Sequence, residues 1–206
     1  MPSLREAQKQ LTRDTIVERA LELFTAKGYA ATTIDEIAAA AGTTRVTFYA
    51  YYPSRTDLMK DFMARVNDVL DRSNDPGQPS TEAELVDVVK AGEQPGILAW
   101  IESRAALWPV FRPYLDVLSD AAAVDTEVRI LLEAWNEEVI SDMVRGMELA
   151  GRFPAQTRHI RGTLAYTQLD YVATLWTRRR FEPNREHALE VLADSWHHLL
   201  CADQHS

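Results

Sequence analysis

Apolar residues recur at helical spacing along most of the chain, and no stretch shows the alternation typical of a β-strand. The clearest case is a predicted helix over residues 34–41, whose apolar side chains share one face: Ile34, Ile37, Ala38 and Ala41. Thr33 and Glu36 have the spacing of a capping box at the start of this helix. Gly42 can adopt the positive φ that ends it. The pattern as a whole predicts an all-α protein of about nine helices.

A second short helix is expected over residues 45–51, after a tight turn. Arg45 can donate two hydrogen bonds to the O6 and N7 atoms of guanine in a DNA major groove. Hydroxyl groups that can reach phosphates or base edges surround it, at Thr44, Thr47, Tyr49 and Tyr51. Helix, glycine-containing turn and polar second helix form the helix-turn-helix pattern. The alternative interpretation is an ordinary helical hairpin with a solvated face.

Further helices are expected at about 13–27, 55–72, 81–92, 95–107, 109–123, 125–150, 157–180 and 183–200. Residues 1–11 are polar and are expected to form a loose arm, with Thr12 capping the first helix. Pro109 and Pro113 are expected to interrupt the helical pattern. Residues 73–80, SNDPGQPS, are the clearest loop signal in the chain.

Several short sequences between residues 12 and 58 match one family: ALELF and KGY at the end of the first helix, ATTIDEIA, the AG turn, TFY, and YYPSRTDL. This segment resembles the DNA-binding domain of TetR-family transcriptional regulators. Two positions depart from the usual family pattern, Val46 and Ala50, and they affect which operator is read. The resemblance implies a helix-turn-helix DNA-binding domain of three helices over residues 1–57. It also implies a helical ligand-binding and dimerisation domain over residues 58–206.

The resemblance also implies the residues that contact DNA. Phosphate contacts are expected from Thr33, Tyr49, Tyr51 and Arg55. Base-edge or mixed contacts are expected from Thr44, Arg45, Val46 and Thr47. The N-terminus of a helix favours an anion, which agrees with the position of Thr33.

The net charge of −9 is unevenly distributed. Residues 1–57 carry as many basic as acidic side chains, so the excess acid lies in the remainder of the chain. A basic patch for DNA needs only local clustering, and its candidates are Arg5, Lys9, Arg13, Arg45 and Arg55. The chain lacks an 18-residue apolar run and an N-terminal apolar leader, and its single cysteine is Cys201. We therefore expect a cytoplasmic protein that does not enter the membrane.

The larger domain is rich in aromatic and methionine residues, which can line a pocket or simply fill a core. The resemblance implies a cavity for a small apolar or amphipathic effector. Its candidate lining residues are Trp100, Trp108, Phe111, Tyr114, Trp135, Met143, Met147, Tyr166, Gln168 and Asp170.

The last two helices carry more apolar residues than one buried face requires, so a homodimer interface is expected there. The candidates are Val172, Trp176, Leu189, Leu192, Trp196 and Leu199. Burial within a single chain is the alternative.

An enzyme is the competing class of protein. Asp194 and His197 share a helix face but are too few for a metal site, and Cys201 has no evident base. No phosphate-binding loop, nucleophile elbow or dinucleotide motif occurs. We therefore expect no enzyme, cofactor or metal. The sequence predicts a dimeric regulator, a repressor, that binds a palindromic double-stranded DNA operator and is released by its effector. The alternative is a ligand-independent DNA-binding protein whose larger domain docks a protein partner.

Overall fold

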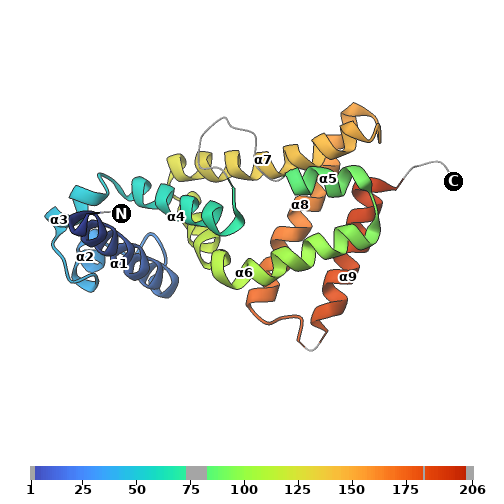
Figure 1. The fold of residues 1–206 in the computed structure, drawn as a ribbon. Helices are drawn as coiled ribbons and strands as arrows, with labels where there is room; N and C mark the ends of the chain where they lie inside the picture. Colours follow the sequence, from blue (N-terminus) through green and yellow to red (C-terminus); the bar gives the residue numbers. More distant parts are fainter. Residues whose placement is uncertain (1–2, 73–82, 183, 203–206) are drawn as a thin grey trace. The chain divides into compact units, whose positions relative to one another are not determined.

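The computed structural model describes residues 3–72, 83–182 and 184–202, and all regular structure in these ranges is helical (Figure 1). The expected all-α fold is confirmed. The elements are α1 (Leu4–Lys27), α2 (Ile34–Ala40), α3 (Arg45–Tyr51), α4 (Arg55–Leu70), α5 (Ala83–Ala91), α6 (Gln94–Ala122), α7 (Thr126–Leu149), α8 (Ala155–Thr177), α9 (Arg185–Trp196) and the π-helix η1 (His197–Cys201). The predicted loop 73–80 lies outside the described residues.

The chain divides into two compact units. Unit 1 comprises Met1–Asn67 and Pro113–Glu133, and unit 2 comprises Asp68–Arg112 and Ala134–Ser206. Unit 1 therefore contains α1 to α3, most of α4, the second part of α6 and the start of α7. The functional division at residues 57 and 58 stays a prediction.

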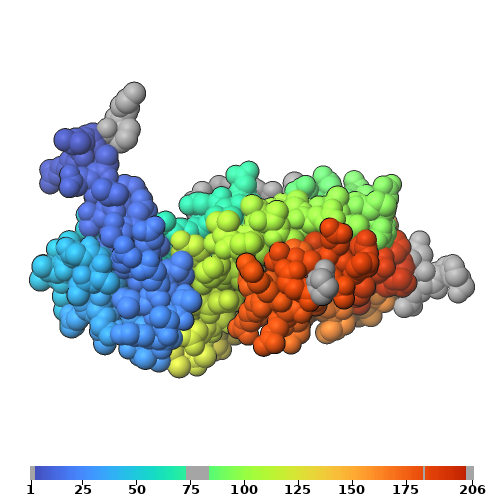
Figure 2. Space-filling view, turned by 90° about the horizontal axis from the view of Figure 1, so that it is seen from below, coloured from blue at the N-terminus to red at the C-terminus, as the bar shows by residue number. Residues whose placement is uncertain are grey.

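Helix α1 begins nine residues earlier than expected, and the prediction of a loose arm over residues 1–11 is wrong for the part described. The cause is local: Ser3 and Glu6 form a capping box, in which the Ser3 backbone N–H donates to Glu6 at 2.7 Å. Thr12 does not cap the helix, because its hydroxyl donates to the carbonyl of Gln8 within it. The first turns of α1 extend beyond the rest of unit 1 and are exposed (Figure 2).

The turn between α2 and α3 agrees with the sequence prediction. Thr33 and Glu36 form the expected capping box, and Thr44 caps α3 by accepting from Thr47 N. Gly42 has φ +66°, where a larger residue would be strained. The interior of unit 1 is formed by apolar residues of α1, α2, α3 and α4: Ile16, Ala20, Phe24, Ile37, Phe48, Leu58 and Phe62.

Helix α6 is continuous through both of its internal prolines, so the expected interruption is wrong. A proline inside a helix costs about 3 kcal/mol because it removes a backbone hydrogen bond. Burying a large apolar side chain stabilises by about 1.5–3 kcal/mol. Four such side chains around Pro109 and Pro113 are buried and offset that cost: Trp108, Phe111, Leu115 and Leu118.

Unit 2 is organised around close contacts between its helices. A side chain at Gly146 in α7 would place its Cβ 2.6 Å from Val89 Cβ in α5, so only glycine permits this approach. Trp100 of α6 stacks on Trp196 at the end of α9, with ring centroids 5.6 Å apart. Cys201 in η1 is buried, and burial raises the pKa of its thiol to about 11. Within the described part of the chain, no helix is both long and apolar enough to cross a membrane.

Candidate nucleic-acid interface

Helix α3 has one face buried in unit 1 and one face exposed. Phe48 and Tyr52, four residues apart, are buried, and the Tyr52 hydroxyl forms hydrogen bonds with Arg13 of α1 and Asp61 of α4. Their rings lie 5.7 Å apart. On the other face, Arg45 and Tyr49 are exposed, and 81% of the Val46 side chain is accessible. The short helix therefore presents its polar residues outward as a group.

Thr44, the N-cap of α3, and Thr47 within the helix are hydrogen-bonded to each other. Thr47 N donates to Thr44 Oγ1 at 3.1 Å, and the two hydroxyl oxygens lie 3.0 Å apart. Each hydroxyl keeps hydrogen-bonding capacity, because a threonine oxygen can donate once and accept twice. Thr44 is exposed and Thr47 half-buried, so Thr44 is the more accessible of the two.

Arg45 contacts a residue that the sequence did not single out. Its Nη1 donates to Asp35 Oδ2 in the first turn of α2 at 3.0 Å. Its guanidinium also lies 5.5 Å from the centre of the Tyr49 ring. The charge of Asp35, followed by the hydrogen bond with Tyr49, raises the pKa of Arg45. The guanidinium is thus held over the outward face of α3.

The N-terminus of α2 already holds an acidic group. The Thr33 hydroxyl and backbone N–H both donate to Glu36, at 3.0 and 2.9 Å. Lys27 donates to the same carboxylate at 2.5 Å. Hydrogen bonds, first from Lys27 and then from Thr33, lower the pKa of Glu36 to about 2, so it is ionised at neutral pH. A phosphate at Thr33, as predicted, would lie beside this carboxylate.

Arg55 is directed toward the interior of unit 1. Its guanidinium lies 3.9 Å from the centre of the Tyr29 ring, and its Nη2 donates to the Tyr29 carbonyl. Tyr29 is held in turn by two acids, because Asp120 accepts from its backbone N–H at 2.6 Å and Asp125 accepts from its hydroxyl at 3.1 Å. The predicted phosphate contact of Arg55 would require another side-chain conformation.

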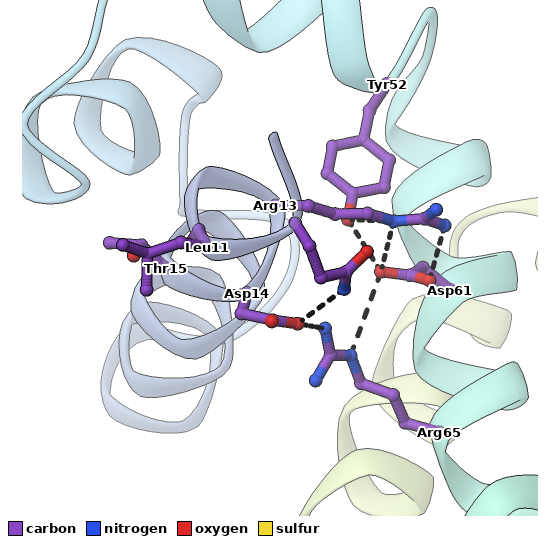
Figure 3. A network of polar contacts seen from close by, with 8 residues as sticks. Leu11, Arg13, Asp14, Thr15, Tyr52, Asp61 and Arg65 are labelled. Carbon is purple, nitrogen blue, oxygen red and sulfur yellow. Dashed lines mark hydrogen bonds and ion pairs between the residues drawn. The ribbon is translucent and has the colours of Figure 1, made fainter. Parts of the chain in front are cut away.

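A polar network joins α1 and α4 to Tyr52, the residue that follows α3. Figure 3 shows Arg13 and Tyr52 converging on Asp61, and Arg65 between Asp14 and Asp61. Asp61 accepts from Tyr52 Oη and from Arg13 Nη2, both at 2.6 Å. Burial and the bond to Asp61 raise the pKa of the Tyr52 phenol. Arg65 donates to Asp14 at 2.5 Å and thereby adds a second bridge between α1 and α4.

The residues predicted to form the basic patch therefore fall into two groups. Arg13 and Arg55 are bound within the unit, whereas Arg5 and Lys9 are exposed. Arg5 and Lys9 lie one helical turn apart in the first turns of α1. They line an open groove of about 970 Å³ together with Ala50 and the half-buried Tyr51 of α3. Of the predicted basic patch, Arg5, Lys9 and Arg45 are the members available at the surface.

Most of the aromatic and methionine residues predicted to line a pocket are buried. Those of unit 2 are Trp100, Trp108, Phe111, Trp135, Met143 and Met147. Tyr114 belongs to unit 1, where its ring packs edge-on against Phe62 at 5.2 Å. Whether these side chains face a ligand stays a prediction.

The polar pocket candidates of unit 2 all have partners. Tyr166 donates to Asn136 at 2.5 Å, and Gln168 accepts from Ser195 at 3.0 Å. Asp170 accepts from Arg112 at 2.5 Å. Burial raises the pKa of the Tyr166 phenol, which keeps it protonated as a hydrogen-bond donor. In the part of the chain that the structure describes, no cluster of three or more histidine, cysteine or acidic residues could hold a metal ion.

The predicted dimer residues divide by burial. Leu189, Leu192 and Trp196 are buried within the chain, and Trp196 Nε1 donates to the Ala165 carbonyl at 3.1 Å. Three others are half-buried: Val172, Trp176 and Leu199. The exposed apolar side chains of α8 and α9 are different residues: Ile160, Leu164, Tyr171 and Val191. Helical spacing reveals two apolar faces on such a helix but not which of them is covered.

A family model matches the N-terminal part of the chain, within unit 1. Residues 16–62 match the family model described as "Bacterial regulatory proteins, tetR family". The HTH-type transcriptional repressor LfrR of Mycolicibacterium smegmatis is 29% identical over 126 residues, 58% of this chain and 66% of LfrR. The HTH-type transcriptional regulator TcmR of Streptomyces glaucescens is 39% identical over 57 residues, 28% of this chain and 25% of TcmR. The chain thus spans just under two thirds of one relative and a quarter of the other.

Solved structures extend the likeness in fold to nearly the whole chain. NalD, the secondary repressor of the MexAB-OprM multidrug efflux pump in Pseudomonas aeruginosa, is 20% identical with a TM-score of 0.67. That comparison covers 94% of this chain and 98% of NalD. A TetR-like transcriptional regulator from Rhodococcus sp. RHA1 is 17% identical with a TM-score of 0.66, covering 93% of this chain and 97% of its own.

Proposed function

Because the chain belongs to the TetR family of transcriptional regulators, we propose that it represses transcription by binding a palindromic DNA operator as a homodimer. LfrR and NalD, two of the similar proteins, are both named as repressors, which supports repression rather than activation. We further propose that a small apolar or amphipathic effector releases it from DNA, and that it acts in the cytoplasm.

The observation that carries this proposal is the division of α3 into a buried and an exposed face. Phe48 and Tyr52 anchor the helix, so Arg45, Val46 and Tyr49 project from a fixed support. A helix held in this way can enter the major groove and present its outward side chains to base edges. Arg45 is the only cationic side chain on α3, and it is the proposed guanine contact.

Arg5 and Lys9 are proposed to contact the DNA backbone beside the site read by α3. The groove that they line also includes Ala50 and Tyr51, so it is continuous with the C-terminal part of the recognition helix. Exposed basic side chains attract phosphates without regard to base sequence. Glu6 lies in the same groove, but its carboxylate is engaged with the Ser3 backbone at the start of α1.

The homodimer is proposed to form through the exposed apolar residues of α8 and α9. Ile160, Leu164 and Tyr171 recur at helical spacing on α8, and Val191 is 68% exposed on α9. Apolar residues of this size on two neighbouring helices suit a four-helix interface with a second copy. Two recognition helices about 34–36 Å apart, or a multiple of that, would then read successive major grooves.

Release is proposed to occur by a population shift. An effector that binds more tightly to the conformation unsuited to the operator lowers the DNA-competent fraction. The predicted aromatic residues of unit 2 would supply an apolar wall, and Tyr166, Gln168 and Asp170 would supply polar contacts. The alternative, a ligand-independent protein that docks a protein partner, would show no change in DNA affinity with any small molecule.

A selection of random double-stranded DNA by the purified full chain tests the proposed function. The expected product is a two-fold symmetric sequence that the protein binds far more tightly than shuffled DNA of equal length. Fluorescence anisotropy at several salt concentrations then gives the affinity and its salt dependence. Failure to enrich any sequence, with the protein folded and dimeric, would refute the assignment.

A further inference from the structure

Within the described residues, Asp35 and Arg45 form an ion pair between the recognition helix α3 and its neighbour α2. The Nη1 of Arg45 lies 3.0 Å from Oδ2 of Asp35, and the side chains are 58% and 63% exposed. A second contact holds the same guanidinium, because Arg45 Nη2 lies 3.5 Å from Tyr49 Oη. The arginine is therefore restrained from two sides on a surface that is open to solvent.

We propose that Asp35 is a specificity-determining residue that positions Arg45 for base recognition. This inference rests on the proposed function, since it assigns a role within the DNA-contacting face of α3. An arginine guanidinium has five N–H donors in a rigid plane. Asp35 and Tyr49 engage two of them, and the remainder can reach the O6 and N7 acceptors of guanine. Restraint lowers the conformational entropy that Arg45 loses when it binds.

The carboxylate adds selectivity by a second route. Asp35 is anionic and exposed beside the face that meets DNA, so it is repelled by phosphates at every sequence alike. At the correct site this repulsion is offset, because Arg45 lies between the carboxylate and the guanine. Asp35 thus disfavours wrong sequences more than the right one.

Stability of the fold does not account for this pair. Thr33 and Glu36 already form the capping box of α2, so the N-terminus of that helix is satisfied without Asp35. Both partners are largely exposed, and exposed ion pairs contribute little to folding. Neither side chain needs the other to avoid a buried charge. The exposed position of the Asp35–Arg45 pair is instead suited to contact with DNA.

A double-mutant cycle on the full chain tests the proposal, with Asp35→Ala, Arg45→Ala and the combination. Affinities are measured for the selected operator, for each single base-pair change and for shuffled DNA. We expect Asp35→Ala to reduce discrimination by about fivefold at the base pairs read by Arg45 and to leave other positions unchanged. In the Arg45→Ala background the same substitution should change discrimination at those positions by less than about twofold. Asp35→Asn, which keeps the shape but not the charge, should tighten binding to shuffled DNA.

Glu22→Ala is the matched control, because Glu22 is an exposed acid on α1 paired with Arg19 rather than with α3. It removes one negative charge and should leave discrimination at every base pair unchanged. Wild-type discrimination in Asp35→Ala would overturn the inference while leaving DNA recognition by α3 intact. An equal effect of Asp35→Ala with and without Arg45 would also overturn it, since Asp35 would then not act through Arg45. A wild-type protein that selects no sequence would instead overturn the proposed function.

Discussion

The Tyr52 hydroxyl donates a 2.6 Å hydrogen bond to Asp61, which joins the residue that follows α3 to the middle of α4. Both side chains are buried, and Arg13 completes the charge balance from α1. The orientation of the recognition helix therefore depends on a buried polar contact as well as on apolar packing.

Replacing Tyr52 by phenylalanine should lower the free energy of unfolding by about 1.5–3 kcal/mol, the usual contribution of a hydrogen bond to a charged group. Urea denaturation at neutral pH measures the change. Tyr49→Phe is the control, because its hydroxyl is exposed, and it should alter stability by less than about 0.5 kcal/mol. Equal small changes in the two variants would mean that the arginines alone satisfy Asp61.

The pKa of Tyr29 predicts a loss of stability at alkaline pH. Burial, followed by the nearby Asp125, raises this pKa from 10.0 to about 12. As pH rises, the unfolded chain therefore ionises first. The stabilisation is complete below pH 10 and is lost between pH 10 and about 12. The difference in unfolding free energy between the wild type and Tyr29→Phe, measured by urea denaturation, should shrink over that window. A constant difference would contradict the assigned environment of the phenol.

Arg5 and Lys9 should contribute to DNA affinity without contributing to sequence preference. Replacing both by alanine should reduce the slope of log affinity against log salt by about 1.8, since each phosphate contact adds about 0.9. Anisotropy titrations on operator and shuffled DNA should show equal losses. Arg19→Ala is the control, because Arg19 lies on the same helix but pairs with Glu22 away from the groove. A slope unchanged in the double variant would exclude the groove from the DNA contact.

Tyr171→Glu combined with Val191→Glu should give a folded monomer that binds the operator weakly. Both side chains are more than 60% exposed, so the added charges disturb an interface and not the interior. Light scattering, circular dichroism and operator binding are measured together. Leu192→Glu, by contrast, places a charge at a buried position and should lower helix content. A double variant that remains dimeric would place the interface elsewhere.

The sequence predicts the ends of a helix correctly where they are set by hydrogen bonds between residues close together in the chain. Thr33 with Glu36, Thr44 and Gly42 define the ends of α2 and α3 through backbone hydrogen bonds within a few residues. The start of α1 was also readable, because Ser3 and Glu6 have the same spacing as Thr33 and Glu36. The polar composition of residues 1–11 predicts a loose arm instead, and the capping box overrides that composition.

Features that depend on distant residues could not be predicted in the same way. Helical periodicity could not show that burial around Pro109 and Pro113 would keep α6 continuous. Positive charge alone could not distinguish Arg13, which binds Asp61, from the exposed Lys9. The pairing of Arg45 with a residue ten positions earlier likewise exists only once the turn between α2 and α3 has formed.

The burial of Cys201 makes the chain a convenient host for spectroscopic probes. Its thiol pKa of about 11 leaves almost no thiolate at neutral pH, and thiolate is the form that reacts with maleimides and methanethiosulfonates. A cysteine introduced at the exposed Gln8 could therefore carry a single spin label or dye on each chain without removal of the native one. In a dimer, the distance between two such labels would report how far apart the two α1 helices lie, with and without a bound small molecule.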